Sequence, residues 1–110
     1  MKRFPVLHKL NKSDMETLTT NMRLSNHACA RLKERYSTND IEVFKNHVRN
    51  STFGYVAGDR VISVELEDGC VALIAQDRNN YFVITIKEPS INKISLQKKY
   101  KLACKGGRRW

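Results

Sequence analysis

The residues best suited to chemistry lie in the segment 25–36, where a histidine and two arginines recur at four-residue steps: His27, Arg31 and Arg35. Side chains four residues apart share one side of a helix, because each residue turns the helix by about 100°. A histidine can act as a base or an acid near neutral pH, and guanidinium groups bind phosphate. Two interpretations are open: an anion site on which His27 acts, or arginines that pair with the protein's own carboxylates or carbonyls. On the helix pattern alone, the structural role is the commoner one.

A second polar group falls in the segment 81–87, whose residues alternate as in a β-strand. We expect one face to be core, formed by Phe82, Ile84 and Ile86. On the other face, Lys87 can stabilise charge on a phosphate, and Thr85 or Tyr81 can orient an oxygen. A helix on the core face would lie across the sheet from Thr85 and Lys87. His27 then meets them only at a rim of the sheet, through strong twist, or if the helix covers the other face.

RNA cleavage by the neighbouring 2′-hydroxyl needs only a base, an acid and cations for the charge that grows on the phosphate. His27 can be the base or the acid, Arg31 and Arg35 can hold the phosphate, and Lys87 can stabilise it. The residue types therefore suffice for this reaction. That these side chains lie close together in space is an expectation.

The segment 89–110 is strongly basic and carries two aromatic residues, Tyr100 and Trp110. Its cations suit phosphate pairing and its aromatic rings suit base stacking. The alternative is a merely solvated tail. The candidate RNA-binding residues are Tyr81, Lys98, Lys99, Lys101, Lys105, Arg108, Arg109 and Trp110.

Expected helices precede expected strands. Ser25 is a typical N-cap for a helix over 25–36, a second helical pattern continues to about residue 49, and Ser13 with Glu16 matches the capping box of a short helix over 14–21. From residue 52 the apolar pattern repeats every second residue in four segments joined by short turns: 52–56, 61–66, 70–76 and 81–87. The sequence therefore predicts an α+β fold, in which two to three N-terminal helices pack on a four-stranded antiparallel meander sheet and a basic C-terminal tail follows.

Composition narrows the functional classes. A chain of 110 residues is normally a single domain. Its net charge of +9 favours nucleic acids or anionic surfaces as partners. Cys29, Cys70 and Cys104 are widely spaced, which indicates neither a disulfide framework nor a zinc site and favours a reducing cytosol. No apolar run matches a signal peptide or a membrane span, and no Gly-rich phosphate loop or metal-binding histidine pair is present. We expect a cytoplasmic protein that uses no metal and no cofactor.

The segments LSNHACARLKERYSTNDIEVF and VALIAQDRNNYFVITIK resemble the small toxin-like domains of the barnase, EndoU, colicin and RelE superfamily. The likeness is to an uncharacterised branch marked by a helix with His, Arg and Arg at four-residue steps and a last strand that ends in a hydroxyl residue. The resemblance implies a metal-independent endoribonuclease in which His27, Arg31, Arg35 and Thr85 take these positions. It divides the chain into an arm with a short helix (1–23), an α+β toxin-like domain (24–88) and a basic tail (89–110).

The leading hypothesis is therefore an RNA-cleaving toxin or phage or mobile-element effector, with RNA as its substrate and a protein antitoxin or host protein as a further partner. The alternative is a non-catalytic binder of RNA or DNA that regulates or inhibits a host enzyme. The two differ in one observable, because only the first yields RNA products.

Overall fold

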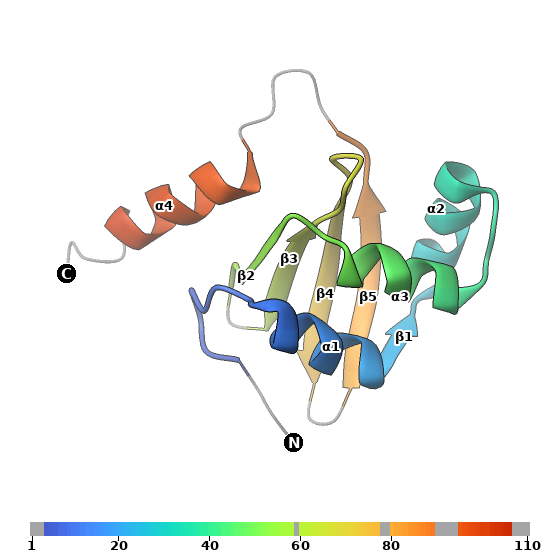
Figure 1. The fold of residues 1–110 in the computed structure, drawn as a ribbon, viewed down its shortest axis with the longest axis horizontal. Helices are drawn as coiled ribbons and strands as arrows, with labels where there is room; N and C mark the ends of the chain where they lie inside the picture. Colours follow the sequence, from blue (N-terminus) through green and yellow to red (C-terminus); the bar gives the residue numbers. More distant parts are fainter. Residues whose placement is uncertain (1–3, 59, 78–79, 90–94, 107–110) are drawn as a thin grey trace.

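The computed structural model describes residues 4–58, 60–77, 80–89 and 95–106, which form four helices and five strands (Figure 1). In chain order these are α1 (Lys12–Thr20), β1 (Met22–Leu24), α2 (Asn26–Tyr36), α3 (Ile41–Arg49), β2 (Phe53–Val56), β3 (Val61–Glu65), β4 (Val71–Asp77), β5 (Asn80–Lys87) and α4 (Leu96–Gly106). The helices and strands expected between residues 25 and 87 are confirmed, and their ends differ from the expected ones by at most one residue.

The predicted architecture, a four-stranded antiparallel meander under N-terminal helices, is wrong. The sheet has five strands in the order β1-β5-β4-β3-β2, and β1 pairs parallel with β5 while the other pairs are antiparallel. The segment 22–24 is too short for alternation to reveal it as a strand, and its place depends on pairing Met22 with Tyr81, far along the chain. The fourth helix, α4, lies within the segment expected to be a tail.

Of the three residues of the last strand that were expected in the core, Ile86 is buried, but the expectation is wrong for Phe82 and Ile84. Tyr81 and Val83 are buried, whereas Phe82 and Ile84 are 42% and 39% exposed. A β-bulge is the cause: Leu73 pairs with Thr85 and the next residue of β4 pairs with Val83, so Ile84 is an extra residue without a partner in the ladder. One extra residue reverses the alternation, and a strict period of two cannot predict it.

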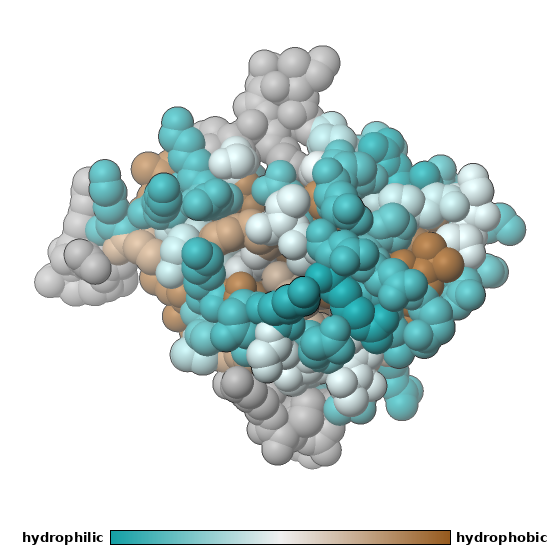
Figure 2. All heavy atoms as spheres, in the orientation of Figure 1, coloured by the Kyte–Doolittle hydropathy of each residue, from teal (hydrophilic) through white to brown (hydrophobic). Residues whose placement is uncertain are grey.

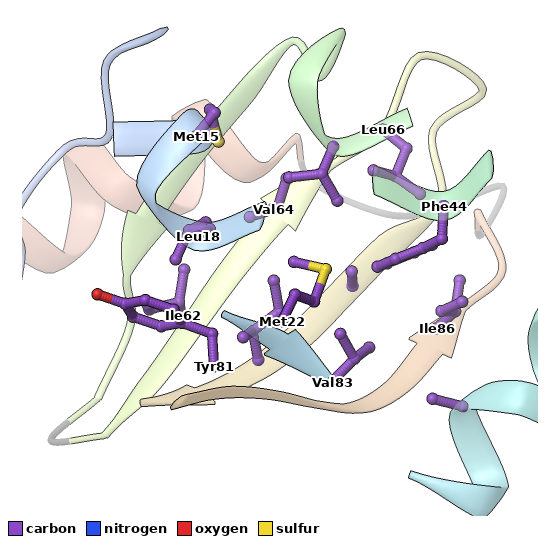
Figure 3. Packing of buried hydrophobic residues seen from close by; sticks show 14 of the residues in the cluster. Met15, Leu18, Met22, Phe44, Ile62, Val64, Leu66, Tyr81, Val83 and Ile86 are labelled. Atoms are coloured by element: carbon purple, nitrogen blue, oxygen red, sulfur yellow. The ribbon is translucent and has the colours of Figure 1, made fainter. Parts of the chain in front are cut away.

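Helices α1 and α3 cover one face of the sheet, which we call the inner face (Figure 1). Figure 3 shows their apolar side chains directed at those of the strands, as with Leu18, Phe44, Ile62 and Val83. Outward, α1 and α3 are largely hydrophilic (Figure 2). Helix α2 lies beside β5 and contributes two buried side chains to this core, Ala28 and Leu32.

The opposite, outer face of the sheet is covered by α4 only at the β2 side. Tyr55 pairs with Ser63 between the inward Ile62 and Val64, so its ring is on the outer face. There Phe53 and Tyr55 pack with Leu96 of α4. Helix α4 therefore lies at the opposite edge of the sheet from α2 (Figure 1). None of the helices described is long and apolar enough to cross a membrane.

Candidate functional site

Ser25 fixes the start of α2 against the bulge of β5. Its Oγ accepts a hydrogen bond from the amide of Ala28 at 2.9 Å and donates one to the carbonyl of Ile84 at 2.8 Å. Its backbone amide donates to the carbonyl of Val83 at 3.0 Å. One residue thus caps the helix and joins it to the strand, which sets the first turn of α2 beside the outward residues of β5.

Four of the five predicted catalytic residues line one pocket of about 390 Å³ between α2 and the end of β5. His27 and Arg31 come from α2, and Thr85 and Lys87 come from β5. Thr85 and Lys87 face outward, because the inward neighbour between them, Ile86, is 3% exposed and belongs to the core. Helix α2 packs at the edge of the sheet, so the side chains meet at its rim, one of the arrangements considered from the sequence.

The ordinary charges of the residues that line the pocket sum to a positive value, with Arg31 and Lys87 against Glu88. Arg31 and Lys87 bring positive charge, and His27 lies in the first turn of α2, where the helix dipole is positive. Arg31 also bonds to Glu34 at 3.2 Å, but the two side chains are 44% and 63% exposed. An exposed pair of this kind contributes little, so it does not prevent Arg31 from binding a phosphate.

Glu88 also lines the pocket, and the sequence interpretation did not select it. It supplies the carboxyl group that a site of His, Arg, Thr and Lys lacks. One sequence signal was available: Glu88 follows Lys87 directly and is the last acidic residue of the chain, because the final 22 residues contain none.

The structure does not bring Arg35 into this pocket. Its Nε lies 3.4 Å from Oδ2 of Asp68, at the turn between β3 and β4. The hydroxyl of Tyr36 donates to the same carboxylate at 2.9 Å. Burial acts to raise the pKa of Asp68, but hydrogen bonds from the Cys70 amide, Tyr36 and Arg35 outweigh it and lower that pKa. Arg35 and Tyr36 therefore join the end of α2 to the turn between β3 and β4.

Those predicted RNA-binding residues that the structure describes lie in two regions, the core and α4. Tyr81 is 1% exposed, its ring stacks on Phe4 with centroids 6.2 Å apart, and burial raises its pKa. It belongs to the core and presents no surface to RNA. Four lysines lie on α4 and are exposed: Lys98, Lys99, Lys101 and Lys105. The last three predicted residues, Arg108, Arg109 and Trp110, lie outside the described residues.

Among the described residues, no group of three or more His, Cys, Asp or Glu side chains is placed to hold a metal ion. The described ranges contain three cysteines, all free: Cys29, Cys70 and Cys104. Burial raises the pKa of the Cys70 thiol, which keeps it neutral.

Comparisons with known proteins give this chain no relatives. No family model, no curated protein and no solved structure matches it.

Proposed function

We propose that this protein is a metal-independent endoribonuclease of the toxin or mobile-element kind, and that the pocket between α2 and β5 binds the phosphate to be cleaved. One observation carries the proposal: His27, Arg31, Thr85 and Lys87, from two elements far apart in the sequence, line the same pocket. The resemblance of the α2 and β5 segments to the barnase, EndoU, colicin and RelE superfamily supports the same function. Free thiols and an RNA substrate suit the cytoplasm.

The proposed reaction is attack of a ribose 2′-oxygen on the adjacent phosphorus. The new bond joins O2′ to phosphorus and the bond from phosphorus to O5′ breaks, so the products are a 2′,3′-cyclic phosphate and a 5′-hydroxyl end. One group must take the 2′-hydroxyl proton and another must give a proton to the leaving oxygen. His27 and Glu88 are the two residues of the pocket suited to these transfers.

The remaining pocket residues hold the phosphate in this proposal. Arg31 and Lys87 face the negative charge that increases on the phosphate oxygens in the transition state. The Thr85 hydroxyl can donate to one of those oxygens. None of these roles requires a metal.

The test uses the full chain, a mixed RNA substrate and excess EDTA. We expect the wild-type chain to cleave, and His27→Ala to lose about 10²- to 10⁴-fold in rate, the range that general acid–base groups contribute. His47→Gln is the matched control, because His47 stacks on Tyr36 with centroids 4.4 Å apart and does not line the pocket. If His27→Ala cuts as fast as the His47→Gln control, His27 is not catalytic.

A second candidate is a non-catalytic binder of nucleic acid, and the exposed lysines of α4 favour it. Lys98 and Lys101 line another pocket with Ser95 and Gln97, at the edge of the sheet opposite α2. A binder of this kind would hold RNA or DNA with an affinity that falls steeply as salt rises. It would leave the RNA uncut, and a host nucleic-acid enzyme that it regulates or inhibits would be its functional partner.

A further inference from the structure

The outer face of β5 carries large apolar side chains in an exposed position. The described ranges contain four exposed large hydrophobic residues, and two of them, Phe82 and Ile84, lie on this strand. Helix α4 packs on β2 at the other side of the outer face and does not cover them. Exposed apolar residues that adjoin one another can form a contact site for a ligand or partner. Here Ala75, the register partner of Phe82, adjoins it.

These apolar residues are continuous with the proposed phosphate pocket. The outward residues of β5 run in the order Phe82, Ile84, Thr85 and Lys87, and the last two line the pocket. Phe82 and Thr85 are three positions apart along the strand, a distance of at most about 10 Å at the usual rise per residue. A nucleotide whose phosphate occupies the pocket therefore has Phe82 within reach of a neighbouring base.

Positive charge accompanies this row of residues. Arg23 of β1 is exposed and pairs in register with Phe82, so both are on the outer face. Lys87 is at the other end of the row. Two acids lie on the same face: Glu65 accepts the Leu96 amide beneath α4 at 3.2 Å, and Asp77 is two residues beyond Ala75, at the Phe82 end of the row. Apolar and aromatic surface between cations suits a polyanion whose bases offer flat faces.

We propose that this surface, formed by Arg23, Phe82 and Ile84, is a base-binding platform for unpaired RNA. A base of the substrate stacks on Phe82, its neighbour packs on Ile84, and Arg23 binds the phosphate between them. Paired RNA keeps its bases inside the helix, so it does not offer a face to the ring. This inference rests on the proposed function, because it names the form of RNA that the pocket receives.

The test measures binding without cleavage, with a fluorescent oligonucleotide in which every 2′-hydroxyl is methylated. We expect the wild-type chain to bind the single strand more tightly than a duplex of the same sequence. Phe82→Ala should weaken single-strand binding by about 5- to 150-fold, the range for loss of one stacked base. Phe82→Trp should restore it. The matched control is Val6→Ala, because Val6 is 51% exposed and adjoins β2 at the opposite edge of the sheet.

Several results overturn the platform. They are duplex binding as tight as single-strand binding, no binding of either form, or a Phe82→Ala chain that binds as the Val6→Ala control does. A thermal melt shows that each variant is folded. In a Trp110→Phe background, Phe82→Trp becomes the single tryptophan of the chain, and saturable quenching by the single strand supports stacking at this position. Absence of quenching contradicts it.

The platform and the nuclease can fail separately. If the wild-type chain cuts ordinary RNA and Phe82→Ala leaves KM unchanged, the platform is rejected and the nuclease stands. If the wild-type chain cuts nothing but Phe82→Ala loses single-strand binding, the nuclease is rejected and the platform stands as the site of a binding protein.

Discussion

Replacement of Ser25 should loosen the contact that brings α2 to the pocket. Its hydroxyl makes two hydrogen bonds, one from the Ala28 amide at 2.9 Å and one to the Ile84 carbonyl at 2.8 Å. Ser25→Ala removes both. Ser25→Asp keeps an acceptor for the helix amide but has no proton for the carbonyl, and Ser25→Thr keeps both functions. The three variants therefore separate the cap from the link to the strand.

The expected loss follows from these two bonds. Removal of a serine N-cap costs about 1 kcal/mol. The bond to Ile84 is solvent-exposed, so its net contribution is about 0.5–1 kcal/mol. The free energy of unfolding of Ser25→Ala should therefore fall by about 1.5–2 kcal/mol, and its Tm by roughly 6–8 °C for a domain of this size. Ser25→Thr should stay close to the wild type and Ser25→Asp should fall between.

Urea titration followed by circular dichroism measures these free energies, and Ser13→Ala is the matched control. Ser13 is exposed on α1, so its replacement should change stability by less than about 0.5 kcal/mol. If Ser25→Ala is as stable as Ser13→Ala, neither hydrogen bond of Ser25 stabilises the fold. If Ser25→Asp is as stable as Ser25→Thr, the bond to β5 contributes nothing. RNA cleavage should also fall in Ser25→Asp at temperatures where it is fully folded, since His27 is then held less firmly.

Three other changes test separate parts of the structure. Asp68 has a lowered pKa, so its stabilising contribution is complete above the ordinary aspartate pKa of about 3.9 and is lost as pH falls through the lower folded value. As the pH is lowered, the Tm of Asp68→Asn should therefore fall less steeply than the Tm of the wild type. An equally steep fall would contradict this. Gly54→Ala would place a methyl group 2.9 Å from Cε of Met15 and 3.3 Å from the carbonyl oxygen of Ser63. The end of the Met15 side chain can shift, so urea titration should show a loss of about 1 kcal/mol, the low end for overpacking; a loss above about 3 kcal/mol would mean that Met15 cannot shift. Arg31→Ala should lower kcat/KM for RNA by about 10²-fold. Lys33→Ala removes the same charge from an exposed residue of the same helix outside the pocket, and it should leave kcat/KM unchanged. If both variants lower kcat/KM equally, only the total charge matters.

In β5, a single β-bulge changes which residues are buried, so the alternating pattern alone does not predict the core residues of this strand. Alternation assigned Phe82 and Ile84 to the core, and the bulge at Ile84 reverses both. The same bulge explains how Ile86 is buried on the inner face while Thr85 and Lys87 are outward and line the pocket. A bulge depends on the pairing of two strands, and the residues of one strand alone do not reveal it.

Local patterns by themselves determined α2, α3 and the strands from 52 to 87, because caps, helical spacing and alternation depend on residues close together in the chain. They also selected His27, Arg31, Thr85 and Lys87. The three-dimensional arrangement was needed to see that these four meet at the rim of the sheet, that Arg35 pairs with Asp68 instead, and that β1 adds a parallel fifth strand. Each of these depends on contacts between distant segments, since a side chain's partner is set by packing and hydrogen bonding in three dimensions.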